Sequence, residues 1–150
     1  MTKTIWIAVA NRATARIFTA DSPLGALDEI ETLIHPAGRA PEQSLVTDKP
    51  GRTYDRAGTG RHADSDTAQH DHEAAVFAAE VAACLAKGRE TDRFGTLIVA
   101  APPAFLGELR KHLDAQTQNL VTLELDKDLA HLGARELRAY LPERLVRHEA

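Results

Sequence analysis

The sequence predicts a single α/β domain, residues 1–150, in which a mixed five-stranded sheet carries helices on both faces. Two short runs, residues 5–10 and 95–101, are apolar at nearly every position, as strands buried on both faces are. Apolar residues recur at helical spacing between and after these runs. The 150 residues are 43% hydrophobic and 27% charged, which is the size and composition of one globular domain.

The first part of the chain is predicted to form an antiparallel meander of three strands. Residues 4–10 place Ile5, Ile7 and Val9 on one face and Trp6, Ala8 and Ala10 on the other. Further strands are expected at about residues 14–20 and 27–35, because turn residues separate the three runs.

A long connection is predicted between about residues 36 and 66. It is rich in proline and glycine and poor in large apolar side chains. Helical order is expected to begin near Thr67, because Phe77, Val81 and Leu85 share the spacing of one buried face, and to stop at Gly88.

The second half alternates between strand and helix. After the strand at 95–101, Pro102 and Pro103 are expected to open a helix, since proline is tolerated in the first helical turn. A fifth strand is predicted at 121–125 and a last helix from about Gly133 to Pro142. The predicted order is therefore β-β-β-α-β-α-β-α.

Positive charge gathers in the long connection. Lys49, Arg52, Arg56 and Arg61 against the single Asp55 give residues 49–62 a formal charge of +3. Because the whole chain carries −4, the remainder carries −7. This segregation favours an anionic partner at the loop, although a solvated loop whose arginines only maintain solubility is the alternative.

The residue types in this loop suit phosphate and base contacts. Glycines let the backbone approach phosphates closely, tyrosine stacks on bases, and histidine gains charge at mildly acidic pH. The candidate binding residues are Lys49, Arg52, Tyr54, Arg56, Gly58, Gly60, Arg61 and His62.

No catalytic residue, cofactor or metal is predicted. His62, His70 and His72 are weak candidates for metal ligands, since residues two apart in a regular helix diverge. A P-loop is excluded because no Lys-Ser or Lys-Thr follows the glycines. A two-metal nuclease is disfavoured because the first strand carries no carboxylate. Cys84 lies on the apolar helix face, where a buried, inert thiol is expected.

The sequence favours the cytoplasm and gives no sign of a membrane. One cysteine forms no internal disulfide, no secretory signal is visible, and no apolar run approaches about 18 residues. The oligomeric state is left open.

Five motifs carry a family resemblance. They are DKPGR at 48–52, GTGRH at 58–62, HDHE at 70–73, APPAFL at 101–106 and ELDKDL at 124–129. Together they resemble the bacterial family of proteins required for attachment to host cells. That family in turn resembles the middle domain of archaeal and eukaryotic peptide-chain release factors, which implies a ribonuclease H-like sheet with an exposed loop before a long helix. The Gly-Gly-Gln of the release-factor loop is Gly58-Thr59-Gly60 here, so peptide release is not carried over.

Three functional hypotheses follow. The first is a release-factor-like binding module whose loop contacts ribosomal RNA or another anionic partner, with any role in host attachment indirect. The second is a hydrolase that acts on an ester such as peptidyl-tRNA through the loop and nearby histidines. The third is a protein-interaction factor that promotes bacterial attachment to host cells.

Overall fold

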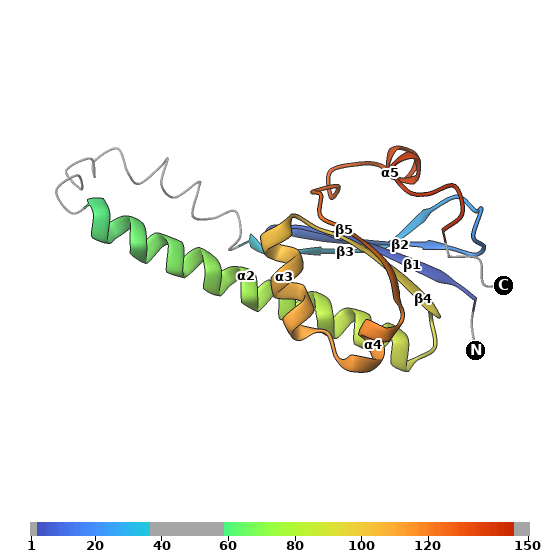
Figure 1. Ribbon diagram of the computed structural model, residues 1–150, viewed down its shortest axis with the longest axis horizontal. Coiled ribbons are helices and arrows are strands. Elements are labelled where there is room, and N and C mark those ends of the chain that lie inside the picture. The colour runs from blue at the N-terminus through green and yellow to red at the C-terminus, as the bar shows by residue number, and fades with distance from the viewer. Residues whose placement is uncertain (1–2, 37–58, 146–150) are drawn as a thin grey trace.

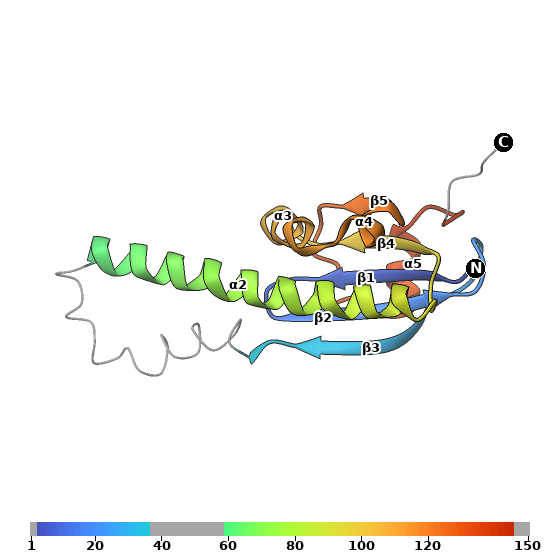
Figure 2. The same cartoon turned by 90° about the horizontal axis from the view of Figure 1, so that it is seen from below.

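The computed structural model describes the backbone of residues 3–36 and 59–145, and the side chains of 3–36 and 71–145. Its centre is a five-stranded sheet (Figure 1). The strands lie in the order β3-β2-β1-β4-β5 (Figure 2). Strands β1 (Ile5–Ala10), β2 (Thr14–Ala20) and β3 (Asp28–Ile34) form an antiparallel meander. Strands β4 (Thr96–Ala100) and β5 (Val121–Leu125) are parallel to β1. The predicted mixed five-stranded sheet is confirmed.

Helices cover both faces of this sheet, as the sequence predicts. The helix α2 (Thr59–Glu90) and the helix α3 (Pro103–His112) lie on one face, and α5 (Ala134–Tyr140) lies on the other. A five-residue helix, α4 (Ala115–Asn119), precedes β5. The sequence prediction missed α4, which is short and has no apolar face of its own to signal it; Asp114 caps its first turn by accepting from the Thr117 amide at 2.6 Å.

The central strand β1 is buried at every position. Its side chains alternate between two separate apolar clusters, since Trp6, Ala8 and Ala10 pack beneath α2 and α3. Ile5, Ile7 and Val9 pack on the face of α5. The predicted division of this strand is therefore confirmed residue by residue.

Close aromatic packing holds the C-terminal end of α2 on the sheet. The Trp6 and Phe94 rings stack with centroids 4.6 Å apart. Gly88 lies against them, and a Cβ there would stand 2.5 Å from the Trp6 Cη2 atom. The prediction that Gly88 ends the helix is wrong: α2 continues to Glu90, and the glycine admits the tryptophan ring instead.

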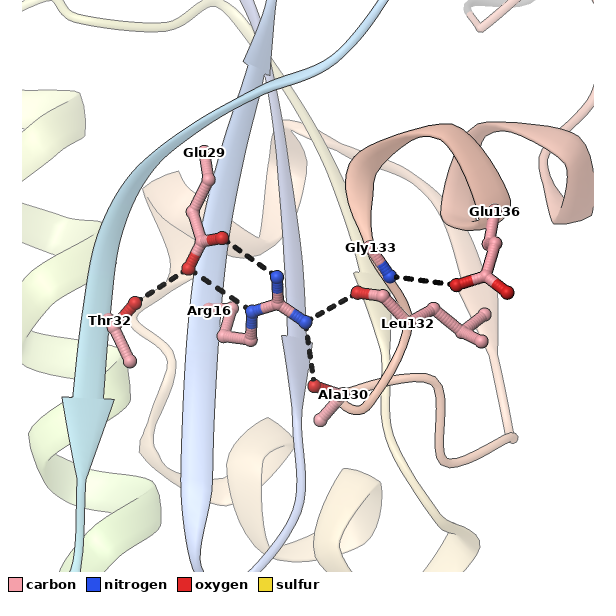
Figure 3. Close-up of polar contacts among 7 residues, drawn as sticks. All are labelled: Arg16, Glu29, Thr32, Ala130, Leu132, Gly133 and Glu136. Carbon is pink, nitrogen blue, oxygen red and sulfur yellow. Dashed lines mark hydrogen bonds and ion pairs between the residues drawn. The ribbon is translucent and has the colours of Figure 1, made fainter.

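The strand β3 is the outer strand of the meander and is mostly exposed. Its register against β2 shifts between Ile17 and Phe18, so that Ile30 is skipped in the pairing. Beside this shift, the Arg16 guanidinium on β2 bonds both carboxylate oxygens of Glu29 on β3, at 3.1 and 2.7 Å. These contacts fasten β3 to its neighbour from the α5 side (Figure 3).

Candidate functional site

Four strands end at the same end of the sheet. β1, β4 and β5 are parallel, and β3 runs in their direction because both it and β1 are antiparallel to β2. The residues that follow these strands are Asn11, His35, Ala101 and Asp126. We call this the carboxyl end of the sheet. Ligands of open α/β sheets commonly bind outside the carboxyl ends of the strands.

The helix α2 extends past this end of the sheet (Figure 2). Its first buried residue among the described side chains is Ala74, fifteen positions after Thr59. At 1.5 Å per residue, about 22 Å of helix separates Thr59 from Ala74. Asp71 and His72, just before the packed part, are exposed.

A buried histidine fastens α2 where it leaves the sheet. His35 follows β3 and is 8% exposed. Its Nε2 lies 2.9 Å from the Glu73 Oε1 of α2, and its ring stacks on Phe77 with centroids 5.0 Å apart. The His35 amide also donates to the Ala13 carbonyl at 2.9 Å. These contacts fix the direction in which the free part of α2 points.

A second polar contact closes the carboxyl end. The Asn11 side-chain oxygen accepts from the amides of Ala13 and Thr14, at 2.8 and 3.0 Å, which shapes the turn between β1 and β2. Its Nδ2 donates to Asp128 after β5, at 3.2 and 3.3 Å from the two carboxylate oxygens. Asp128 therefore serves as a tie between two loops.

On the α5 face, Arg16 bonds the same loop that contains Asp128 (Figure 3). Its guanidinium donates to the carbonyls of Ala130, at 3.0 Å, and Leu132. The hydrogen bonds from Arg16 and then from Thr32 lower the pKa of Glu29 to about 2. Glu29 therefore stays ionised and holds the arginine across the loop that leads into α5.

The predicted binding residues fall into two groups. Lys49, Arg52, Tyr54, Arg56 and Gly58 lie outside the described residues. Gly60, Arg61 and His62 lie in the first turns of α2, where the backbone is described and the side chains are not.

The predicted loop of residues 36–66 is too long, because the helix begins at Thr59 rather than near Thr67. The apolar periodicity that marks the packed part starts only where α2 meets the sheet. A helix that extends beyond the core needs no apolar face there, so its first turns carry no such signal.

A metal site finds no support in the described part of the chain. His62 and His70 lie outside the described side chains, and His72 is exposed. Among residues 3–36 and 71–145, no three His, Cys, Asp or Glu side chains are grouped to hold an ion. Within the same part of the chain, no helix is long and apolar enough to cross a membrane.

Cys84 on α2 is half-buried, where the sequence predicts a buried thiol. Burial, and next the charge of Glu31, raise the pKa of its thiol above the ordinary value. The thiolate, which is the nucleophilic form, is therefore disfavoured, in keeping with the inert thiol that the sequence predicts.

The sequence prediction missed His35, Glu73, Arg16 and Glu29 as contributors to this end of the molecule. The contact between His35 and Glu73 joins residues 38 positions apart, and that between Arg16 and Glu29 joins residues 13 positions apart. Arg16 reaches carbonyls more than 110 positions away. A single charged residue inside a predicted strand, as Arg16 is, was the one signal available.

This chain is similar to a known protein family and to solved structures. The profile of a family described as "Protein required for attachment to host cells" matches residues 6–141. Among solved structures, an archaeal translation termination factor is similar, with 18% identity and a TM-score of 0.46 over 89% of this chain. This chain spans 32% of that protein. No curated protein sequence matches.

Proposed function

This chain belongs to the family of proteins required for attachment to host cells, and on that premise we propose that it is a binding module for RNA. Its basic segment, residues 49–62, would make the contact, and ribosomal RNA is the first partner to test. The observation that carries the proposal is the extension of α2 past the carboxyl end of the sheet. The helix begins inside the basic segment, so its free end is where that segment joins the fold.

Charge supports an anionic partner. The basic segment carries +3 while the rest of the chain carries −7, so a polyanion is attracted to one region and repelled by the others. Asp71 follows the basic segment on α2 and is exposed. Its carboxylate repels phosphate, which opposes RNA binding further along the helix. Arginine suits the contact because its planar group bonds phosphate at two points.

The fixed direction of α2 supports the same proposal. A binding segment on a loosely attached helix would lose more conformational freedom on binding. The contact between His35 and Glu73, at 2.9 Å, removes part of that freedom in advance. We therefore assign the carboxyl end a positioning role and the basic segment the contact with RNA.

An RNA-binding module acts on attachment indirectly, by changing which proteins are made. The proposal accordingly places this chain in the cytoplasm, where ribosomes are available. It requires neither a catalytic residue nor a cofactor. The three candidate metal ligands, His62, His70 and His72, have no role in it beyond the charge that His62 adds at mildly acidic pH.

Ribosome co-sedimentation tests the proposal. We expect the wild-type chain to pellet with ribosomes at low salt and to be released at high salt, since phosphate contacts weaken as salt rises. The triple variant Arg52→Ala, Arg56→Ala and Arg61→Ala should remain in the supernatant at both concentrations.

A charge-matched control distinguishes the loss of contacts from the basic segment from the loss of net positive charge. Lys3, Lys111 and Arg144 are exposed and lie outside the basic segment, so their triple alanine variant removes the same charge elsewhere. This control should pellet like the wild type. Equal pelleting by both triple variants would reject the proposed contact, and release of a model peptidyl-tRNA by the wild type would favour the hydrolase.

A further inference from the structure

A hollow of about 530 Å³ opens on the face of the sheet opposite α2. It lies between the segment that leads into β3 and the helix α5. Its walls are mostly small and apolar, with two arginines, and are formed by Ala26, Leu27, Ala134, Arg135, Arg138 and Ala139. Sites for small molecules have volumes of about 300–1,000 Å³ and combine apolar walls with a few polar groups.

Arg138 is held rigidly in this wall. Its Nε donates to the Gly25 carbonyl at 2.9 Å, and its two terminal nitrogens donate to the carbonyls of Pro23, Pro142 and Glu143, at 3.4, 2.8 and 2.6 Å. Four of the five N–H groups of the guanidinium are therefore used. All four acceptors are neutral, and no carboxylate of the described residues forms an ion pair with Arg138. Its positive charge is left uncompensated at the hollow.

Arg135 lies one turn earlier on α5 and is exposed. Within the described part of the chain, no hydrogen bond or ion pair engages its guanidinium. Its donors are therefore available to a ligand, whereas Arg138 supplies a fixed charge beside them. Leu27, which is 5% exposed, gives the hollow a firm apolar floor.

We infer that this hollow binds a small amphipathic carboxylate, with the carboxylate on Arg135 and the apolar portion against Ala26, Leu27 and Ala139. A guanidinium bonds a carboxylate through two parallel N–H groups, which a neutral head group cannot match. The apolar walls favour an acyl or aromatic group over a free inorganic anion. This inference does not depend on the proposed function.

Titration of the isotope-labelled chain with octanoate, followed by amide NMR shifts, tests the inference. We expect saturable shifts at Ala26, Leu27, Ala134 and Ala139. 1-Octanol has the same chain without the charge and should bind at least tenfold more weakly. Absence of saturable shifts with octanoate, or equal binding of octanol, would overturn the inference.

Variants of the hollow locate the site. Arg135→Gln should weaken octanoate binding at least tenfold, and Ala139→Leu should abolish it by filling the hollow. Both residues are exposed, so the amide spectra of the free variants should stay close to that of the wild type. Lys111→Gln removes one charge far from α5 and should change the affinity less than twofold. Wild-type affinity in either hollow variant would contradict the site.

Discussion

The two faces of the sheet are covered by different means. On one face, α2 and α3 pack through large apolar side chains, including the stacked rings of Trp6 and Phe94. On the other, the seven-residue helix α5 buries Leu137 in a second apolar cluster, and Arg16 and Arg138 also bond backbone carbonyls before and after it. A helix this short buries little apolar surface and is marginal by itself. We call Arg16 and Arg138, with the carbonyls that they bond, polar clamps, and the difference indicates that they supplement apolar packing where the helix is short.

Removing a clamp should have the largest effect on stability. Arg138→Ala removes the guanidinium donor of three carbonyls, whereas the Pro23 carbonyl still accepts from the Leu145 amide at 2.8 Å. We expect a loss of about 3 kcal/mol in the free energy of unfolding, measured by urea denaturation. Arg135→Ala, on the same helix and without such contacts, should change it by less than about 0.5 kcal/mol. An equal loss of stability in the two variants would contradict the role given to the hydrogen bonds of Arg138.

On the face covered by α2 and α3, the test adds volume to the core instead of removing hydrogen bonds. Gly88→Ala places a methyl group 2.5 Å from the Trp6 ring, which is itself buried. We expect a net loss of about 2 kcal/mol in stability, despite the higher helix propensity of alanine.

A second glycine provides the control for Gly88. Gly107 lies in α3 with nothing within 4 Å of the position a Cβ would take. Gly107→Ala should therefore stabilise the chain by about 1 kcal/mol through helix propensity alone. Thermal denaturation of both variants should shift the midpoint in opposite directions; a shift in the same direction would contradict the packing described for Trp6.

Acid should weaken the Arg16 clamp. The pKa of Glu29 is about 2 in the fold against an ordinary value of 4.5, so its contribution to stability is complete above pH 4.5 and is lost as pH falls through 2. Because the pair is partly exposed, we expect only about 1 kcal/mol. Urea midpoints measured between pH 5 and 2 should show this loss.

The variant Glu29→Gln isolates that effect. It should be less stable than the wild type at pH 5 and should lose less stability on acidification. Glu80→Gln, at an exposed residue of α2 away from Arg16 and Arg138, should retain the acid sensitivity of the wild type. If Glu29→Gln were as acid-sensitive as the wild type, the clamp would not be its source.

The smallest expected change in stability is at His35, which contacts α2 where the helix leaves the sheet. His35→Phe keeps the ring contact with Phe77 and removes the bond to Glu73, so global stability should fall by only about 0.5 kcal/mol. Hydrogen exchange of residues 71–77 should nevertheless become faster. His131→Phe, at an exposed histidine, should leave that exchange unchanged, and the same result for His35→Phe would argue against a fastening role.

Local patterns in the sequence were sufficient for most of the fold. The alternation of β1 assigned Ile7 and Trp6 to opposite faces, and the apolar run of β4 identified it as a buried strand. The start of α2 could not be predicted, because a helix outside the core has no apolar periodicity to display. Gly88 was misread for a related reason: close approach of Trp6 is a tertiary contact that leaves no local signature.

The candidate site was less predictable than the fold. Its charge segregation can be read directly from the sequence, and so residues 49–62 could be selected. The residues that orient α2 could not, because His35 meets Glu73 only after the sheet and the helix have packed. The arginine clamps are also tertiary, since they depend on carbonyls that every residue possesses.

The salt dependence of RNA binding tests the central claim most directly. Fluorescence anisotropy of a labelled single-stranded oligouridine should show a slope of log K against log salt of roughly −2.8, if Lys49, Arg52, Arg56 and Arg61 each contact one phosphate. Replacing these four residues by alanine should abolish binding, and Arg61→Ala alone should reduce the slope by about 0.7. A slope near zero in the wild type, or an unchanged slope in the fourfold variant, would contradict the account.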